Sequence, residues 1–198
     1  MREFIYFSGK ARTSGNFRDL MSAGRMDIAI HSLINAFFLS NSVREDVILH
    51  LLFYGPPDPP KHLEFTYHPN MPISKKDVAG LLKRMLYKCK PNKKTEVFPG
   101  CFIEKKSLFD LIEELKNKGR AIYVLDRNGK ELEKSTLGNS VFLIGDHEGL
   151  PKKEIKRLKQ ECKILSIGKK VYFASHVVTI LNYLIDKEEI EEASNRIV

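Results

Sequence analysis

The stretch Val141-Phe-Leu-Ile-Gly-Asp-His-Glu-Gly-Leu-Pro151 indicates the fold class of this chain. Its first four residues are apolar, too few for a buried helix and suited to a buried strand. A polar loop between Gly145 and Gly149 follows, and Pro151 suits the first turn of a helix. A strand, a glycine-flanked polar loop and a helix in succession often form ligand sites at the carboxyl ends of parallel strands. The alternative is an ordinary turn that uses Gly and Asp for backbone reasons.

A second stretch, Cys162-Lys-Ile-Leu-Ser-Ile-Gly168, repeats the pattern of a short buried strand that ends in a glycine-containing loop. Two basic residues come next, and apolar residues then recur at helical spacing. These are Val177, Val178, Leu181, Leu184 and Ile185. We therefore expect two successive strands to end in loops that could share one ligand.

Composition indicates one soluble domain. The chain has 198 residues, of which 42% are hydrophobic and 29% charged, as in ordinary globular proteins. No apolar run approaches the ~18 residues of a membrane span, and the N-terminus lacks the features of a signal peptide. Three widely spaced cysteines favour a reducing compartment, which predicts a cytoplasmic protein, and argue against a disulfide framework or a zinc site.

The net charge of +8 favours a polyanionic partner, of which nucleic acid is the commonest. A basic surface that only keeps the protein soluble is the alternative. Lys152, Lys153, Lys156, Arg157 and Lys159 lie close together after the first loop, but such a charge run is usually a solvated helix face.

The rest of the chain alternates strands with helices. Strands are expected at Arg2–Ser8, 47–54, 63–67, near 101–103 and at 121–125, the 63–67 strand pairing antiparallel. Helices are expected at about 28–39, after a capping box at Ser74 through about Lys90, and from a second cap at Ser107 to Gly119. Asp126-Arg-Asn-Gly129 has the chemistry of a turn. This order predicts one α/β domain, residues 1–198, with a mostly parallel sheet.

Several motifs, in this order and spacing, resemble the SPOUT class of RNA methyltransferases, and more narrowly the archaeal TrmY family. They are Gly24-Arg-Met-Asp27, Tyr54-Gly-Pro-Pro-Asp-Pro-Pro60, Gly145-Asp-His-Glu-Gly149, Ser166-Ile-Gly168 and Ser175-His-Val-Val-Thr-Ile-Leu-Asn182. That family methylates N1 of the pseudouridine at position 54 in the T-arm of tRNA. The resemblance covers nearly the whole chain.

The resemblance implies a SPOUT-type α/β fold whose C-terminal region, about residues 121–198, is threaded into a deep trefoil knot. It also implies a homodimer with the knot helices in its interface, tRNA as substrate and S-adenosyl-L-methionine as cofactor. No metal is expected, because the sulfonium carbon of the cofactor is already electrophilic. The apolar stripe that begins at Val177 is compatible with a dimer interface and equally with burial in the core.

By position in the family, the cofactor is expected to be held by the two loops and the start of the last helix. The expected residues are Leu125, Ile144, Gly145, Asp146, Ser166, Ile167, Gly168, Lys169, Lys170, Val171, Ala174 and Val177. Glycine lets the backbone approach the ligand closely. For each apolar residue in this set, core packing is the alternative.

N1 of pseudouridine carries a proton that must leave during methyl transfer, so the site needs a proton acceptor. Asp27, Asp146 and His147 are candidates, and Asp27 is favoured, with Arg25 as a clamp for phosphate or a carbonyl. The alternatives are that Asp27 caps its helix and pairs with Arg25, and that Asp146 orients its loop. His147 and His176 are expected to be structural. The expected catalytic residues are therefore Asp27, Arg25 and Asp146.

RNA binding should use phosphate contacts for affinity and a flipped base for selection. The expected contacts are Lys10, Arg12, Arg18, Arg25 and Arg44. Other functions stay open: pseudouridine N1-methylation of small-subunit rRNA in ribosome assembly, or a knotted RNA-binding protein without catalysis. A nucleotide-binding α/β protein is disfavoured, because neither GxxxxGK[ST] nor GxGxxG follows a strand.

Overall fold

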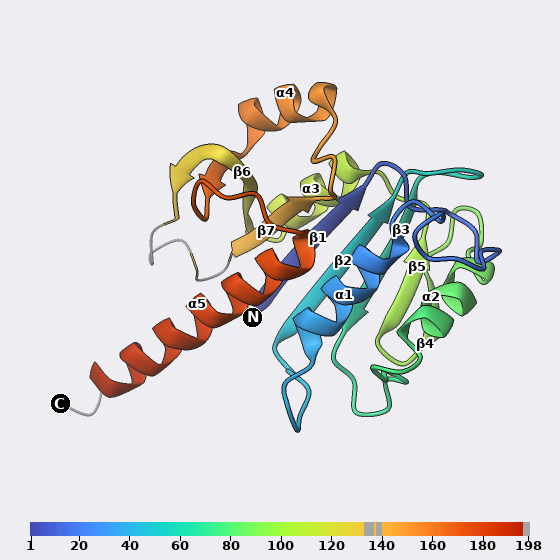
Figure 1. The fold of residues 1–198 in the computed structure, drawn as a ribbon, viewed down its shortest axis with the longest axis horizontal. Helices are drawn as coiled ribbons and strands as arrows, with labels where there is room; N and C mark the ends of the chain where they lie inside the picture. The colour runs from blue at the N-terminus through green and yellow to red at the C-terminus, as the bar shows by residue number, and fades with distance from the viewer. Residues whose placement is uncertain (133–136, 138–139, 196–198) are drawn as a thin grey trace.

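The computed structural model describes residues 1–132, 137 and 140–195, and its centre is a single twisted sheet with helices on both faces (Figure 1). The strand order within the described residues is β4-β5-β3-β2-β1-β7-β6-β8. The strands are β1 (Arg2–Ser8), β2 (Val47–Phe53), β3 (Lys61–Thr66), β4 (Thr95–Phe98), β5 (Cys101–Glu104), β6 (Ala121–Glu131), β7 (Ser140–Gly145) and β8 (Lys163–Ser166). The helices are α1 (Met26–Phe37), α2 (Val78–Tyr87), α3 (Leu108–Asn117), α4 (Lys152–Glu161) and α5 (Ala174–Asn195).

Strand β1 lies in the middle of the sheet, and all seven of its residues are buried. It pairs in parallel with β2 on one side and β7 on the other. Phe4 and Tyr6 point into the core under α1, α2 and α5, whereas Ile5 and Phe7 point into the core under α3 and α4. A strand buried on both faces has no polar side to alternate with, which explains its continuous apolar run.

The sheet is parallel over β2, β1, β7, β6 and β8, and antiparallel where β3, β5 and β4 are added. The expected α/β class, the mostly parallel sheet and the antiparallel 63–67 strand are therefore confirmed. Because β7 and β8 run in the same direction, their carboxyl ends lie at the same edge of the sheet. This direction brings the two glycine-containing loops together.

The expected turn at Asp126–Gly129 is wrong, because these residues belong to β6. The β6–β8 ladder shifts register between Leu125 and Lys130, both of which are aligned with Leu165. Asp126 Oδ1 accepts a hydrogen bond from the backbone N–H of Asn128 at 2.8 Å, so the Asn-Gly sequence makes an irregularity inside the strand. Pairing with β8 thus overrides the local turn preference.

The two expected caps have opposite outcomes. Ser107 and Asp110 form a capping box at α3, and Gly119 follows the helix at a φ of 74°, as expected. Helix α2 instead begins at Val78 after Asp77, without a side-chain cap, and ends at Tyr87 rather than near Lys90. Asp77 pairs with Arg84 at 2.9 Å instead. Strand β4 was not expected.

Helix α5 packs on α1, and the stripe that begins at Val177 is largely buried there rather than exposed. Val178 and Leu181 are fully buried. Within this chain the stripe therefore serves core burial. None of the helices in the described residues is long and apolar enough to cross a membrane.

The guanidinium of Arg2 ties the far end of α5 to the sheet. This side chain is 4% exposed, and it lies 2.8 Å from Asp46, 2.5 Å from Asp186 and 2.8 Å from Glu189. Arg44 binds the same Asp186 carboxylate through two hydrogen bonds of 2.8 and 2.6 Å. A shared carboxylate between two guanidinium groups fixes where α5 lies against β1 and β2.

We expect Arg2→Ala to lower the free energy of unfolding by about 2 kcal/mol, less than a fully buried pair would lose, because its carboxylate partners stay partly in water. Urea unfolding followed by circular dichroism measures this change. Lys187→Ala, which removes an exposed ion pair with Glu191 on the same helix, is the control. Equal losses in the two variants would contradict the role of Arg2.

A chain of buried polar side chains crosses the sheet from β1 to β5. His50 lies 3.0 Å from Glu3, and His62 lies 3.1 Å from Glu104. Burial lowers the pKa of His62 to about 4, so its ring is neutral at pH 7. Burial works to raise the pKa of Glu104, but hydrogen bonds from His62 and Lys106 outweigh burial and lower this pKa to about 2. Glu104 is therefore ionised inside the protein.

Candidate cofactor and acceptor site

The loop after β7 is closed by its own backbone. Gly149 N–H donates to the carbonyl of Asp146 at 2.9 Å, and Gly149 has a φ of 76°, a left-handed conformation that glycine adopts without strain. A Cβ atom on Gly145 would lie 2.6 Å from the carbonyl carbon of Gly149. Two glycines are thus needed for the chain to fold back this tightly.

The Asp146 carboxylate joins this loop to the end of β1. It is 8% exposed. Oδ2 accepts hydrogen bonds from the Ser8 hydroxyl at 2.8 Å and the Gly9 N–H at 3.2 Å, and Oδ1 accepts one from the Glu148 N–H at 2.9 Å. Both oxygens are therefore engaged in fixing two loops, as the loop-orienting alternative predicts.

The loop after β8 is also held by a side chain. Ser166 Oγ accepts a hydrogen bond from Gly168 N–H at 3.1 Å and donates to the Gly168 carbonyl at 3.0 Å. Gly168 has a φ of 123°, a conformation that other residues rarely adopt. This arrangement turns the chain sharply away from the sheet before α5 begins at Ala174.

A cavity of about 330 Å³ lies between the two loops. Most of the residues expected to hold the cofactor line it: Leu125, Ile144, Gly145, Asp146, Ser166, Ile167, Gly168, Lys170, Val171 and Val177. Lys169 is exposed outside the lining, and Ala174 is buried at the start of α5 outside it. The volume is within the ~300–1,000 Å³ range of sites for small ligands.

Several lining residues were not expected from the sequence. Asp126 and Arg127 line the cavity because β6 continues past Leu125. Tyr172 lines it from the segment between β8 and α5, and Ile155 and Lys159 do so from α4. Asp126 and Arg127 were missed because a turn was expected at 126–129. The α4 residues could be placed only once the direction of that helix was known.

Arg25 and Asp27 line a second cavity, of about 240 Å³, rather than the first. Its other lining residues come from α1, from the residue just before α5 and from the start of α5: Ile28, His31, Asn35, Phe173, Ser175 and His176. Tyr172 lines the first cavity and its neighbour Phe173 lines the second, so one short segment borders both. His176 is exposed beside the Phe173 ring, contrary to the expectation of a satisfied structural histidine.

Arg25 and Asp27 form a bidentate ion pair at the start of α1. Nε and Nη2 of Arg25 lie 3.0 Å from Oδ1 and Oδ2 of Asp27. Hydrogen bonding from Arg25 lowers the pKa of Asp27, so the carboxylate is ionised at neutral pH. Arg25, at a φ of 60°, is the N-cap residue of α1, so the alternative that Asp27 caps the helix is wrong, whereas its pairing with Arg25 is confirmed.

The structure does not gather the five basic candidates into one patch. Lys10 is exposed and forms an ion pair with Glu148 at the first cavity. Arg18 is exposed in the loop before α1, and Arg12 is partly buried in the same loop. Arg44 lies in the ion pair with Asp186 and lines neither cavity. Of the five, Arg25 lines a cavity and Lys10 pairs with a residue that lines one.

Comparison with known proteins identifies the family. A family model of SAM-dependent RNA methyltransferases matches residues 1–190. The chain belongs to this family. It is 32% identical to the tRNA (pseudouridine(54)-N(1))-methyltransferase of Methanocaldococcus jannaschii, over 97% of this chain and 100% of that protein. It is 35% identical to the enzyme of the same name from Methanococcoides burtonii, over 94% of this chain and 96% of that protein.

The fold is also similar to a solved structure, that of Archaeoglobus fulgidus Nep1 bound to S-adenosylhomocysteine. The TM-score is 0.67, at 14% sequence identity, and the match covers 96% of this chain and 99% of that one. At this identity the likeness concerns the fold. The two chains therefore share one α/β architecture along nearly their whole length.

We expect Gly145→Ala to weaken S-adenosylmethionine binding at least tenfold, because the added Cβ forces the loop away from Gly149 and widens the cavity wall. Isothermal titration calorimetry measures the affinity. Gly9→Ala is the control, since a Cβ there meets nothing within 4 Å. An unchanged affinity in Gly145→Ala would show that the closed loop does not form the cofactor wall.

Proposed function

We infer that this protein transfers a methyl group from S-adenosylmethionine to N1 of pseudouridine 54 in tRNA. The observation that carries this inference is a cavity closed by two glycine loops, in a chain 32–35% identical over nearly its full length to tRNA (pseudouridine(54)-N(1))-methyltransferases. The basic net charge of +8 suits an RNA substrate. The rRNA alternative is not favoured, because the similar curated relatives act on tRNA by name.

The residues around the first cavity fit S-adenosylmethionine. Gly145 and Gly168 leave backbone groups open to an adenosine, and apolar walls come from Leu125, Ile144 and Val177. When bound, the cofactor supplies a methyl group on a positively charged sulfur. The protein then has to orient donor and acceptor in line, which is mainly a matter of positioning. Ala174, which is buried at the start of α5, supports the wall from behind in this proposal, whereas the exposed Lys169 lies outside it.

We propose that Asp146 positions the loop after β7 and does not itself accept the proton. Its carboxylate already accepts three hydrogen bonds, from Ser8, Gly9 and Glu148. Both carboxylate oxygens are thus occupied in holding the ends of two strands together. Its contribution is to keep the β7 loop at the distance from β1 that the cofactor requires.

Asp27 is the proposed acceptor of the N1 proton. It lines the second cavity, which borders the first through Tyr172 and Phe173, and this is where a flipped base would lie. Arg25 keeps the carboxylate ionised, and its own guanidinium, in a side chain that is 27% exposed, lies 5.7 Å from the centre of the Phe173 ring. A base or a phosphate that enters the cavity can accept hydrogen bonds from Arg25 in place of Asp27. The Asp27 carboxylate is then available to accept the proton.

The proposed RNA surface consists of Lys10, Arg12, Arg18 and Arg25, with the basic helix α4 beside the first cavity. Arg44 is left out of it, because its side chain is only 11% exposed and lines neither cavity. Contacts to phosphate would make tRNA affinity fall steeply with salt concentration. A salt titration of tRNA binding measures the number of such contacts.

We also propose a SPOUT-type trefoil knot, a homodimer and a cytoplasmic location. Support for the knot is that the chain leaves β8, the outermost strand, and returns across β7 to pack α5 against α1 (Figure 1). Part of the region 121–198 lies outside the described residues. Support for the dimer comes from exposed apolar side chains just before α5 and in its first half. These are Val171, Tyr172, Phe173 and Tyr183. Sedimentation equilibrium tests whether the protein is a dimer in solution.

The function is tested with tRNA transcripts that contain either pseudouridine or uridine at position 54. We expect methyl transfer from labelled S-adenosylmethionine only to the pseudouridine-containing tRNA, because uridine offers no N1 proton to replace. Mass spectrometry of the digested product locates the methyl group. Transfer to a small-subunit rRNA hairpin and not to tRNA would replace the proposed substrate, and S-adenosylmethionine binding without transfer would indicate a non-catalytic binding protein.

We expect Asp27→Ala to bind S-adenosylmethionine normally and to lose at least about 100-fold in turnover, because the N1 proton has no acceptor. Single-turnover transfer to tRNA measures the rate, and calorimetry measures cofactor binding. Asp19→Asn, in the exposed loop before α1, is the control. Full activity of Asp27→Ala would remove Asp27 as the proton acceptor.

A further inference from the structure

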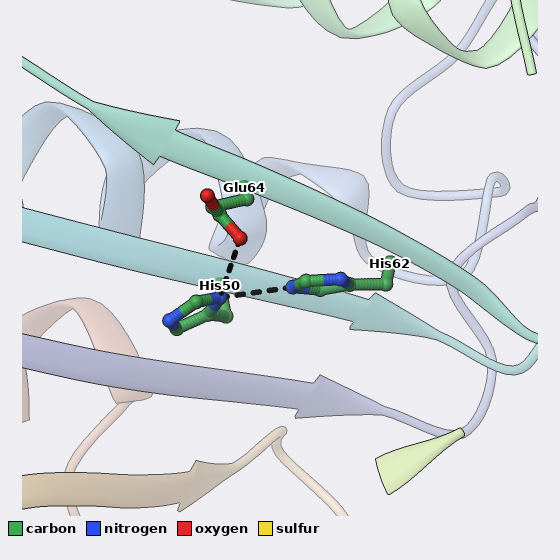
Figure 2. Close-up of side chains that lie close together, drawn as sticks. All are labelled: His50, His62 and Glu64. Carbon is green, nitrogen blue, oxygen red and sulfur yellow. Dashed lines mark hydrogen bonds and ion pairs between the residues drawn. The ribbon is translucent and has the colours of Figure 1, made fainter. Parts of the chain in front are cut away.

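Three side chains on strands β2 and β3 point toward one another on one face of the sheet, away from both cavities. They are His50, His62 and Glu64, shown in Figure 2. His50 and Glu64 are directly opposite each other in the antiparallel pair, and His62 lies two residues before Glu64. His50 Nδ1 is 2.9 Å from His62 Nε2 and 3.9 Å from Glu64 Oε2.

The outer nitrogen of each ring faces a carboxylate. His50 Nε2 lies 3.0 Å from Glu3 Oε1, and His62 Nδ1 lies 3.1 Å from Glu104 Oε1. Each carboxylate also has a cation: Arg120 Nε lies 2.8 Å from Glu3, and Lys106 Nζ lies 2.6 Å from Glu104. Ionised carboxylates only accept hydrogen bonds, so each outer ring nitrogen must carry the N–H.

Where both rings are neutral, the two inner nitrogens have no proton between them. A neutral imidazole has one N–H, and here both are directed outward, to Glu3 and Glu104. His50 Nδ1 and His62 Nε2 then turn two lone pairs toward each other at 2.9 Å, next to the Glu64 carboxylate. A positive species among three such donors, either a proton shared by the two rings or a metal ion, stabilises the arrangement.

The arrangement has the features of a transition-metal site. Metal-bound histidines usually donate the second ring N–H to a carboxylate, which fixes the tautomer, and both rings here do so. The side chains of His50 and His62 are 3% and 1% exposed, so the donors are shielded from water. Two imidazoles and one carboxylate are ligands suited to Zn²⁺, Co²⁺ or Ni²⁺ rather than to Mg²⁺ or Ca²⁺.

The two rings need only a small movement to bind one ion. Two nitrogens bound tetrahedrally at Zn–N distances of about 2.0–2.1 Å lie about 3.3 Å apart, so the rings would separate by a few tenths of an ångström. Glu64 Oε2, which lies 3.9 Å from His50 Nδ1, would move toward both ring nitrogens, all three ligand atoms lying within 4.8 Å of one another. Lys94, which lies 2.7 Å from Glu64 Oε2 and is 37% exposed, can move into solvent when a cation takes its place.

We propose that His50 Nδ1, His62 Nε2 and Glu64 form a binding site for one divalent transition-metal ion, separate from the methyl-transfer site. Glu3 and Glu104 orient the two histidines from outside. Ligands from β2 and β3 would connect the parallel half of the sheet to its antiparallel half. The ion is therefore structural: it adds stability and takes no part in methyl transfer.

The test uses the full-length, tag-free protein after treatment with EDTA. Titration with ZnCl₂ in the calorimeter should show one Zn²⁺ per chain, and Zn²⁺ should raise the melting temperature in a concentration-dependent way. Co²⁺ should give the visible absorption of a tetrahedral nitrogen–oxygen site. Glu64→Gln and His62→Gln should each weaken Zn²⁺ binding at least tenfold and reduce the cobalt spectrum.

His68→Gln is the matched control, because His68 is an exposed histidine just after β3 and outside the cluster. If His62→Gln unfolds, Glu64→Gln still tests Zn²⁺ binding, because Glu64 lies at the edge of the cluster. Absence of stoichiometric Zn²⁺ binding in the wild-type protein would overturn the proposal. So would nitrogen NMR that shows a third proton shared between His50 and His62 in the presence of excess Zn²⁺, or equal Zn²⁺ affinity in Glu64→Gln and His68→Gln.

Discussion

The hydrogen bonds of the Asp146 carboxylate hold the functional end of this molecule together. They join the end of β1, through Ser8 and Gly9, to the loop that follows β7. These two strands are neighbours in the centre of the sheet and run in parallel, so their carboxyl ends lie side by side. A buried carboxylate needs hydrogen-bond donors, and the three that Asp146 finds here hold the cavity wall against the end of β1.

The same end of the sheet explains how donor and acceptor can meet. The first cavity is formed by the loops after β7 and β8, and the second by α1 and the start of α5. The segment Tyr172-Phe173 borders both, so a short piece of chain separates the place proposed for the cofactor from the place proposed for the base. Methyl transfer requires only that these two positions face each other, because the donor carbon is already electrophilic.

Far from this end, polar groups are used differently. Arg2 binds three carboxylates and fixes the direction of α5, while the chain from Glu3 through His50 and His62 to Glu104 crosses the sheet. Neither feature lines either of the two cavities described above. The family's chemistry accounts for the residues at the carboxyl ends of the parallel strands, and the proposed cation site gives the histidine pair a separate role.

Local patterns in the chain were enough to predict the α/β class, the parallel sheet and the two glycine loops, because strand-loop-helix patterns are local and the motifs around Gly145 and Gly168 carry the family resemblance. They could not predict which residues meet. Asp126 and Arg127 reached the cavity only because pairing with β8 extends β6, and Arg44 found its partner Asp186 only when α5 packed on α1. His50, His62 and Glu64 stand 12 and 2 residues apart in the chain, with no spacing typical of a metal site. Cross-strand register alone places them together, since register is a property of the folded sheet and not of either strand.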